Sequence, residues 1–327
     1  MIVSIFKKNY FLQLILLILL PLLLWIPAFI TSPQIISAGR LDMPLYEVLE
    51  YIFPEQSVMN TITAFLFVVG QAFLLNYILT YYEITKKNSY FPAFIYMLLF
   101  SCDYRIMTLS SILCANWFVI LAILSFLQCY NKSEGLDQIF LTSFLVGIAS
   151  LFYVPYILLM FWIWIGLLNF KIYKWRPLIV SLLGMIAPYV VLTVIYYLDN
   201  RIDTILTFFP EHFFLLPEFA FMNQPIQIVY MAYLLVLILP ALFYSLSYKN
   251  DQKLSVRKRA STIIILFAFS LLPFLYTMTS PAMSLIFAPS LAFIFTVFFF
   301  AIKRPLYSNL FILILLILTI AKIYINY

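Results

Sequence analysis

Long, nearly uninterrupted apolar runs fill this sequence, and short polar connectors separate them. The runs last roughly 17 to 25 residues without the two-residue alternation of strands, which is the pattern of membrane-spanning helices. A closed β-barrel would instead need alternating segments of about ten residues. We therefore predict an all-α polytopic transmembrane bundle of about 11 spans. They lie at 10–30, 59–81, 89–102, 107–130, 138–153, 155–171, 177–198, 226–247, 261–278, 283–301 and 306–325.

The orientation depends on where two stretches turn. The third span is short, and the fifth and sixth form one apolar stretch, broken only at Tyr153-Val154-Pro155. Turns near Pro155 and at Asp103-Tyr104-Arg105 place 15 of the 19 basic residues on one side and nine of the 13 acidic residues on the other. Because basic residues concentrate in cytoplasmic connectors, the pattern predicts an N-terminus inside and a C-terminus outside.

Composition supports lipid as the solvent. Of the 327 residues, 65% are hydrophobic and 10% are charged, whereas soluble domains carry about 25% charged residues. The run from Tyr10 to Ile30 is long for a signal peptide and has no small-residue cleavage site, so we expect it to remain as the first span. Cys102, Cys114 and Cys129 lie in or beside apolar runs and are expected to pack as small apolar side chains.

Two connectors on the predicted outer side are long, 31–58 and 199–225. The first has apolar residues at helical spacing and two carboxylates on another face, which indicates a short amphipathic helix on the membrane surface. Its apolar positions are Leu45, Val48, Leu49 and Ile52, and its carboxylates are Glu47 and Glu50. The second holds an apolar string, Phe208–Phe214, that is expected to return to the bilayer interface. With no soluble domain, 1–327 forms a single transmembrane domain.

Several classes of chemistry lack their sequence marks. No ionisable residue lies near the middle of a predicted span, which argues against ion-coupled transport. There is no phosphate-binding G-x-x-x-x-G-K-[ST] loop, no G-x-S-x-G elbow and only one histidine. The basic connectors are expected to contact anionic lipid headgroups, not nucleic acid. Polar residues inside the spans are expected to bond to neighbouring helices. They include Gln71, Asn76, Asn116 and Gln128.

The remaining candidates are charged residues of the predicted outer side. Asp42 could act as a general base or bind a divalent metal, although a wet interfacial loop also explains it. Arg40 or Arg105 could hold the phosphate of a lipid-linked substrate. Asp103 is the second catalytic candidate. It could border a cavity together with Arg105, or the two residues could simply neutralise each other at a turn.

A third candidate is the pair Glu211 and His212 in the second long connector, as a substrate-binding site. Their place in a solvated loop is the alternative explanation. The sequence indicates no cofactor with certainty. A divalent metal is the cofactor that carboxylates of the predicted outer side could hold.

The stretch 74–198 resembles an uncharacterised family of bacterial inner-membrane proteins. The likeness rests on the four strings Thr85–Tyr90, Ala115–Phe118, Gly147–Tyr153 and Lys174–Pro177. The resemblance implies a multi-pass protein of the bacterial inner membrane, and it implies no particular activity.

The layout is also similar to the GT-C superfamily of membrane glycosyltransferases. Cys102–Gln128 resembles their short-helix, outer-turn, long-helix unit, and Phe144–Leu168 resembles their paired short helices. The resemblance implies sugar transfer from a polyprenyl-phosphate carrier at the outer face, with Asp42 as base or metal ligand. The first outer loop is short and lacks the paired acidic signature of many members.

Three functions stay open from the sequence. The first is the glycosyltransferase that the resemblance implies, with membrane lipids and a lipid-linked sugar as partners. The second is a non-enzymatic membrane subunit or assembly factor of a cell-envelope complex, with another membrane protein as partner. The third is a lipid flippase or transporter.

Overall fold

The computed structural model describes residues 5–6, 10–33, 44–53, 57–85, 89–132, 135–200, 225–248, 252–276, 285–302 and 304–326. Within these ranges the chain is helical, with no strand. The elements are α2 (Tyr10–Thr31), α3 (Pro44–Ile52), α4 (Val58–Tyr81), α5 (Phe91–Phe100), η2 (Tyr104–Ile106), α6 (Ser111–Gln128), α7 (Leu136–Ser150), η3 (Val154–Leu159), α8 (Met160–Asn169), α9 (Trp175–Leu198), α11 (Pro225–Tyr248), α12 (Leu254–Tyr276), α13 (Ala288–Ala301) and α14 (Pro305–Asn326).

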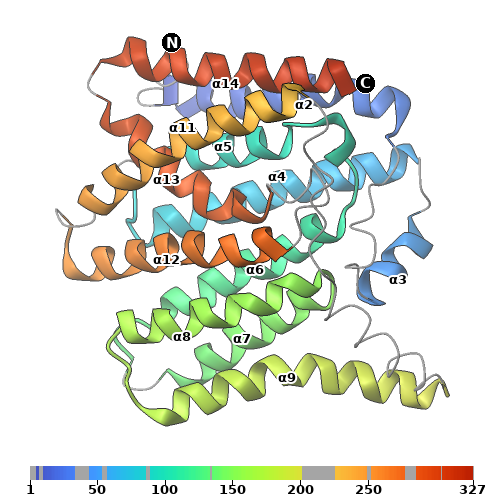
Figure 1. The fold of residues 1–327 in the computed structure, drawn as a ribbon, viewed down its shortest axis with the longest axis vertical. Coiled ribbons are helices and arrows are strands. Elements are labelled where there is room, and N and C mark those ends of the chain that lie inside the picture. The colour runs from blue at the N-terminus through green and yellow to red at the C-terminus, as the bar shows by residue number, and fades with distance from the viewer. Residues whose placement is uncertain are drawn as a thin grey trace.

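The helices lie side by side as one bundle, and most run along a common direction (Figure 1). Six are long and apolar enough to cross a bilayer, which confirms an all-α protein of membrane-compatible character. They begin or end within a few residues of predicted spans: Phe11–Thr31, Val58–Tyr81, Ser111–Gln128, Trp175–Leu198, Pro225–Tyr248 and Leu306–Ile325. Each of the other predicted spans also contains a helix, although these are shorter or more polar.

The α-helical structure is interrupted at both places where turns were predicted. Helix α7 ends at Ser150, the 3₁₀ helix η3 begins at Val154, and α8 follows at Met160. Pro155 occupies the first turn of η3, where its missing N–H leaves no bond unmade. The second turn separates α5 from α6 and contains η2, so Asp103 and Arg105 lie between two helices and outside both.

Helix α5 is short because protein, not lipid, surrounds it. All ten of its residues are buried, and it packs against α2, α4 and α13. A helix enclosed on every side need not match the thickness of the hydrocarbon layer, which is the requirement that sets the length of lipid-facing helices. Its apolar sequence on all faces follows from the same enclosure.

Helices α7 and α9 make the most extensive contact among the described helices, and a glycine permits it. A Cβ atom added at Gly147 would lie 2.7 Å from the main-chain oxygen of Met185. Small residues at such crossings let two helix backbones approach, which is how membrane helices gain packing energy in lipid. Gly184 has the same role on α9, facing Ser143 and Phe140.

The predicted amphipathic helix is α3, but its apolar face differs from the expected one. Tyr46 is 1% exposed, and its hydroxyl donates to the main-chain oxygen of Leu109 at 2.9 Å. Leu45 and Leu49 pack on the core, whereas Val48 is 55% exposed. Docking to the α5–α6 connector therefore orients α3 as much as its apolar stripe does.

Polar residues inside the bundle are held by neighbouring helices, as expected. Gln71 donates to the main-chain oxygen of Leu113 at 2.7 Å and accepts from the Tyr96 hydroxyl at 2.6 Å. Asn116 accepts from the Tyr156 hydroxyl at 2.6 Å. Asn76 departs from the expectation, because its buried Oδ1 atom has no hydrogen-bond partner in the described chain.

Candidate functional site

Asp103 is fully buried and holds Arg105 through both of its carboxylate oxygens. Oδ1 accepts from the Arg105 main-chain N–H and from Nε, each at 3.1 Å, and Oδ2 accepts from Nη2 at 3.1 Å. The side chain of Arg105 is 31% exposed. The carboxylate also caps η2, because the 3₁₀ turn leaves the Arg105 N–H without a main-chain partner. The i, i+2 spacing thus builds a bidentate pair within one short turn.

A second cation reaches the same carboxylate from the far end of the chain. The Nζ atom of Lys322, on α14, lies 3.1 Å from Asp103 Oδ2, and both side chains are fully buried. Lys322 Nζ also lies 4.9 Å from the ring centroid of Tyr230, on α11. Among the described atoms, no hydrogen bond of good geometry engages that ammonium. One carboxylate therefore faces two cations, and the cluster carries one net positive charge.

The electrostatic balance keeps Asp103 ionised. Burial raises the pKa of this carboxyl, but the hydrogen bonds from Arg105 and the charges of Lys322 and Arg105 together lower it below the usual value. A carboxylate whose lone pairs are all engaged by cations is a poor proton acceptor. Asp103 is therefore suited to positioning Arg105 and Lys322, not to taking a proton from a substrate.

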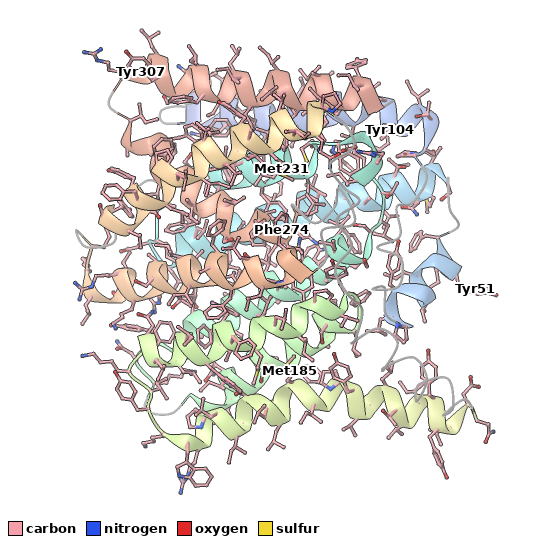
Figure 2. All side chains as sticks on the ribbon, viewed as in Figure 1. Tyr51, Tyr104, Met185, Met231, Phe274 and Tyr307 are labelled. Atoms are coloured by element: carbon pink, nitrogen blue, oxygen red, sulfur yellow. The ribbon has the colours of Figure 1, made fainter. Side chains whose placement is uncertain are left out.

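An apolar cavity of about 260 Å³ begins beside this cluster. Cys102 and Tyr230 line it at the charged end, and apolar side chains from α5, α11, α12 and α13 line the rest. Figure 2 labels Met231 and Phe274, which line it from α11 and α12, and Tyr104 of the adjoining turn. Leu235 and Leu271, at its wall, are 60% and 40% exposed, so the cavity adjoins the outward apolar face of the bundle.

Hydrogen bonds from three other helices hold the turn that carries Asp103. Trp25 of α2 donates from Nε1 to Ser101 Oγ at 2.9 Å, and Thr31 of α2 bonds to the Tyr104 hydroxyl. Asn60 of α4 accepts from the Leu109 N–H at 2.7 Å, next to the carbonyl that Tyr46 of α3 engages. Such a supporting layer fixes the geometry of charged groups that would otherwise be mobile at a helix end.

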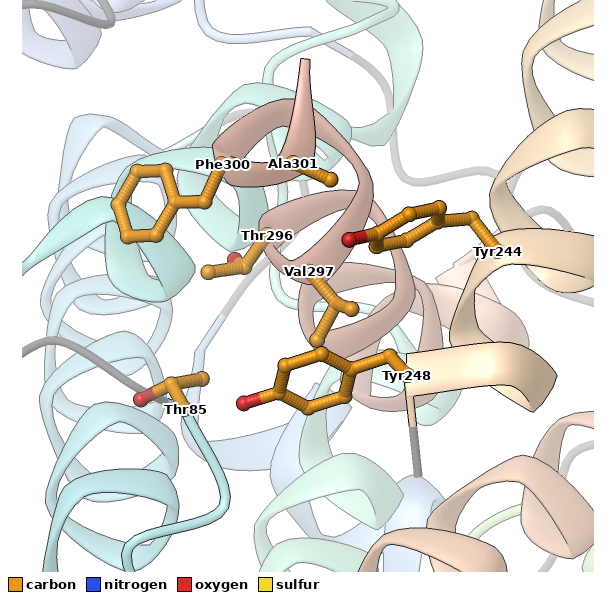
Figure 3. A pocket seen from close by; sticks show the side chains of 7 residues that line it. All are labelled: Thr85, Tyr244, Tyr248, Thr296, Val297, Phe300 and Ala301. Atoms are coloured by element: carbon orange, nitrogen blue, oxygen red, sulfur yellow. The ribbon is translucent and has the colours of Figure 1, made fainter. Parts of the chain in front are cut away.

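A second cavity, of about 240 Å³, lies at the end of the bundle where α4, α11 and α13 finish (Figure 3). Tyr244 and Tyr248 of α11 face Thr296 and Phe300 of α13 across it, with Thr85 below. Tyr248 donates to the main-chain oxygen of Ile84 at 3.4 Å. Its described lining has hydroxyls but no carboxylate or ammonium, which makes it a weaker candidate for chemistry.

Two of the six predicted site residues are brought together, and four are outside the described residues. Asp103 and Arg105 form the pair above, whereas Arg40, Asp42, Glu211 and His212 belong to 34–43 and 201–224. The side chains of Glu47 and Glu50 are likewise outside. In the part of the chain that the structure describes, no three His, Cys, Asp or Glu side chains gather as metal ligands would. Cys102, Cys114 and Cys129 are buried and form no disulfide with one another.

Lys322 and Tyr230 belong to this site but were not predicted from the sequence. Lys322 was expected only as one of the four basic residues of the predicted outer side. A signal was present: Lys322 lies inside the apolar run 306–325, within a turn of its end, at the same predicted depth as Asp103. An ionisable residue within a span is a reason to look for its partner. Tyr230 carried no such signal among the 24 tyrosines of the chain.

Comparison with known proteins adds no relative: no protein-family model, no curated protein and no solved structure matches this chain.

Proposed function

We propose that this chain is a GT-C-like membrane protein that binds a polyprenyl-phosphate carrier at the outer end of its bundle and transfers the sugar it bears. The observation that carries the proposal is an apolar cavity ending at a buried cluster of one carboxylate and two cations. That combination matches a ligand with a long hydrocarbon chain and an anionic head.

The hydrocarbon part of the ligand suits the cavity between α5, α11, α12 and α13. Its described lining beyond Cys102 and Tyr230 is Leu, Ile, Met and Phe, and burial of apolar surface there is favourable by roughly 25 cal/mol per Å² if the reference is water. For a lipid already in the bilayer that gain is smaller, so shape and the polar end must provide selectivity. The exposed rim at Leu235 gives a lateral path from the bilayer.

The phosphate part of the ligand suits the net positive charge beside Cys102. Arg105 donates two side-chain hydrogen bonds to Asp103, one from Nε and one from Nη2. A guanidinium has five N–H donors in all. The remaining donors are on a side chain that is 31% exposed. Lys322 is fully buried and makes an ion pair with Asp103, so in this proposal its ammonium adds positive charge behind Arg105 without touching the ligand. Asp103 then holds both cations in place.

Asp42 is assigned as the base that takes the proton of an acceptor hydroxyl, because Asp103 is saturated by its two cations. The acceptor oxygen bonds to C1 of the sugar while the bond from C1 to the carrier phosphate breaks, and the polyprenyl phosphate leaves. Asp42 belongs to the connector that leads into α3, and α3 is docked on the turn beside Asp103 by the Tyr46–Leu109 hydrogen bond. In this proposal Arg40 assists Arg105 at the phosphate, and Glu211 with His212 contacts the substrate from the second long connector. A divalent metal held by Asp42 is the alternative role for that residue.

The proposed topology has eleven crossings in a bacterial inner membrane, with the N-terminus inside and the C-terminus outside. It is supported by the gathering of Lys132, Lys171 and Lys258 around one cavity at the opposite end of α12 and α6 from the Asp103 cluster. Basic residues at the cytoplasmic face of a membrane protein follow the usual bias. Short helices such as α5 cross as buried segments inside the ring of longer ones.

A non-enzymatic membrane subunit of an envelope complex is the second candidate. One observation favours it: the saturated carboxylate at Asp103 is what a structural pin between η2 and α14 would use. Under this function the cavity holds structural lipid, and no substrate turns over.

The test combines lipid binding with transfer. The full chain in nanodiscs is titrated with a photoreactive polyprenyl phosphate. Filling the cavity with Leu234→Trp is expected to weaken capture at least about tenfold, which corresponds to about 1.4 kcal/mol. Leu239→Trp is the matched control, because Leu239 is on the same helix and 69% exposed, whereas Leu234 is buried. Equal capture by both variants would refute the lipid site.

Transfer is measured separately with a labelled polyprenyl-phosphate sugar. Asp42→Asn and Asp42→Ala are expected to abolish transfer and keep capture. Full transfer by both variants would remove Asp42 as the base, and absence of transfer by the wild type with intact capture would favour the non-enzymatic candidate.

A further inference from the structure

A cavity of about 290 Å³ at the end of the bundle remote from Asp103 is lined by four lysines. Lys132 follows α6, Lys171 and Lys174 connect α8 to α9, and Lys258 belongs to the first turns of α12. No carboxylate is part of its described lining. Lysines from two connectors and from α12 thus converge on one space, which is unlike a row of charges along a solvated helix face.

Lys258 is held in place by the end of α8. Asn169, the last residue of α8, donates from Nδ2 to the main-chain oxygen of Lys258 at 2.8 Å and to Thr262 Oγ1 at 3.1 Å. Lys258 Nζ in turn donates to the main-chain oxygen of Asn169. These reciprocal bonds join the end of α8 to the start of α12 and define one wall of the cavity.

A helix end alone explains only part of this arrangement. The carbonyl-rich C-terminus of α8 attracts a cation, and Lys258 satisfies that demand. Lys132 and Lys171 are exposed and form no ion pair with any described carboxylate. The C-terminus of α8 therefore accounts for Lys258 but not for the convergence of Lys132 and Lys171 on the same cavity.

Neighbouring positive charges affect the pKa of Lys258, which precedes the predicted span 261–278. Burial lowers the pKa of this ammonium, and the charges of Lys171 and Arg257 lower it further. Arg259, the next residue, stacks over the ring of Tyr130 at 5.2 Å from its centroid, and Tyr130 also lines the cavity. A bound anion would relieve this repulsion between cations.

From this convergence we infer that the cavity between the ends of α6 and α8 and the start of α12 is a binding site for a phosphate group. Lys132, Lys171 and Lys258 supply its donors, and Tyr130 and Tyr173 flank them. The phosphate is borne either by an anionic phospholipid of the adjoining leaflet or by a soluble phosphate ester. The site is separate from the Asp103 cluster and independent of the proposed sugar transfer.

The experiment is lysine footprinting of the full chain in nanodiscs of phosphatidylcholine. Acetylation of each lysine is followed by mass spectrometry, first with inorganic phosphate added and then with phosphatidylglycerol included in the disc. Protection of Lys132, Lys171 and Lys258 by inorganic phosphate supports a site for soluble phosphate esters. Protection only by phosphatidylglycerol supports a headgroup site.

Lys253 serves as the internal control, because it is exposed, lies immediately before α12 and does not line the cavity. Lys171→Gln is expected to weaken protection of Lys132 about fivefold, the factor that corresponds to about 1 kcal/mol per basic residue. Lys253→Gln, with the same change in charge, is expected to leave it unchanged. Absence of protection in both arms, or equal protection of Lys253, would overturn the site.

Discussion

Lys322 and Asp103 are joined by a buried ion pair of 3.1 Å, although they belong to the last helix and to an early turn of the chain. Neither side chain is exposed, so the pair is enclosed by the bundle. A buried charge is tolerated only when a partner compensates its lost hydration. Asp103 is the counterion of both Lys322 and Arg105. The three residues should therefore contribute unequally to the free energy of unfolding.

Removing the shared anion should harm the fold more than removing either cation. Asp103→Asn leaves Lys322 buried without its counterion, and the expected loss in free energy of unfolding is about 3 to 5 kcal/mol. Lys322→Met leaves Asp103 paired with Arg105, so a smaller loss of about 1 to 2 kcal/mol is expected. Denaturant unfolding in a fixed detergent measures both.

The exposed Lys253 provides the control for that comparison, since Lys253→Met removes a lysine that makes no ion pair with a described residue. Its free energy of unfolding should match that of the wild type. If Lys322→Met were as damaging as Asp103→Asn, then the pairing of Asp103 with Arg105 would not be sufficient to satisfy the carboxylate, contrary to the geometry.

The same carboxylate predicts a direction for the effect of pH on stability. The pKa of Asp103 is lowered in the folded state, whereas an unfolded aspartate titrates at about 3.9. Its stabilising contribution is therefore present above that unfolded value and is lost as the pH falls through the folded one. Unfolding monitored from pH 7 to pH 3 should show this loss below about pH 4 in the wild type.

Asp103→Asn should lack that part of the acid dependence, because no proton is then taken up at this position. Asp137→Asn is the matched control, since Asp137 is exposed in the first turn of α7, and it should retain the wild-type slope. An identical slope in Asp103→Asn and in the wild type would show that other carboxylates carry the whole effect.

The helices were largely predictable because the length of an apolar run and the bias of basic residues act locally along the chain. The turn at Pro155 illustrates this: one proline and the charge count on either side located it. The shortness of α5 was also readable, but its cause, enclosure by α2, α4 and α13, depends on packing between distant segments.

The candidate site was predictable only where its members are neighbours in sequence. Asp103 and Arg105 are two residues apart, so their pairing at a tight turn is a local property. Lys322 joins them because α14 packs beside η2. The hydrophobic pattern within α14 does not indicate which turn of the chain it packs against. Tyr46 was likewise missed as the anchor of α3, because its partner is a main-chain oxygen and carries no signal in the side-chain pattern.

The contact between α7 and α9 should be sensitive to a single methyl group. Gly147→Ala places a Cβ 2.7 Å from the Met185 main-chain oxygen, which belongs to a helix and cannot rotate away. A loss of about 1 to 3 kcal/mol in free energy of unfolding is expected from such overpacking. Gly70→Ala is the comparison, because its Cβ would meet only the ring of Trp117, at 2.8 Å.

Trp117 is partly exposed, so its ring can shift. Gly70→Ala should therefore lower the free energy of unfolding clearly less than Gly147→Ala. Similar losses for the two variants would mean that the approach of α7 to α9 is looser than the structure has it.

Docking of α3 on the turn that carries Asp103 should depend on one hydroxyl. Tyr46→Phe removes the donor to the Leu109 main-chain oxygen and leaves that buried acceptor without its partner, at a cost of about 1 kcal/mol. Hydrogen–deuterium exchange of 44–52 should become faster as a result, because local opening of α3 becomes easier. Tyr51→Phe is the matched control on the same helix, since Tyr51 is 91% exposed. If the exchange of 44–52 were unchanged in Tyr46→Phe, then α3 would be held by its apolar contacts alone, and the link between the connector of Asp42 and the Asp103 cluster would be lost.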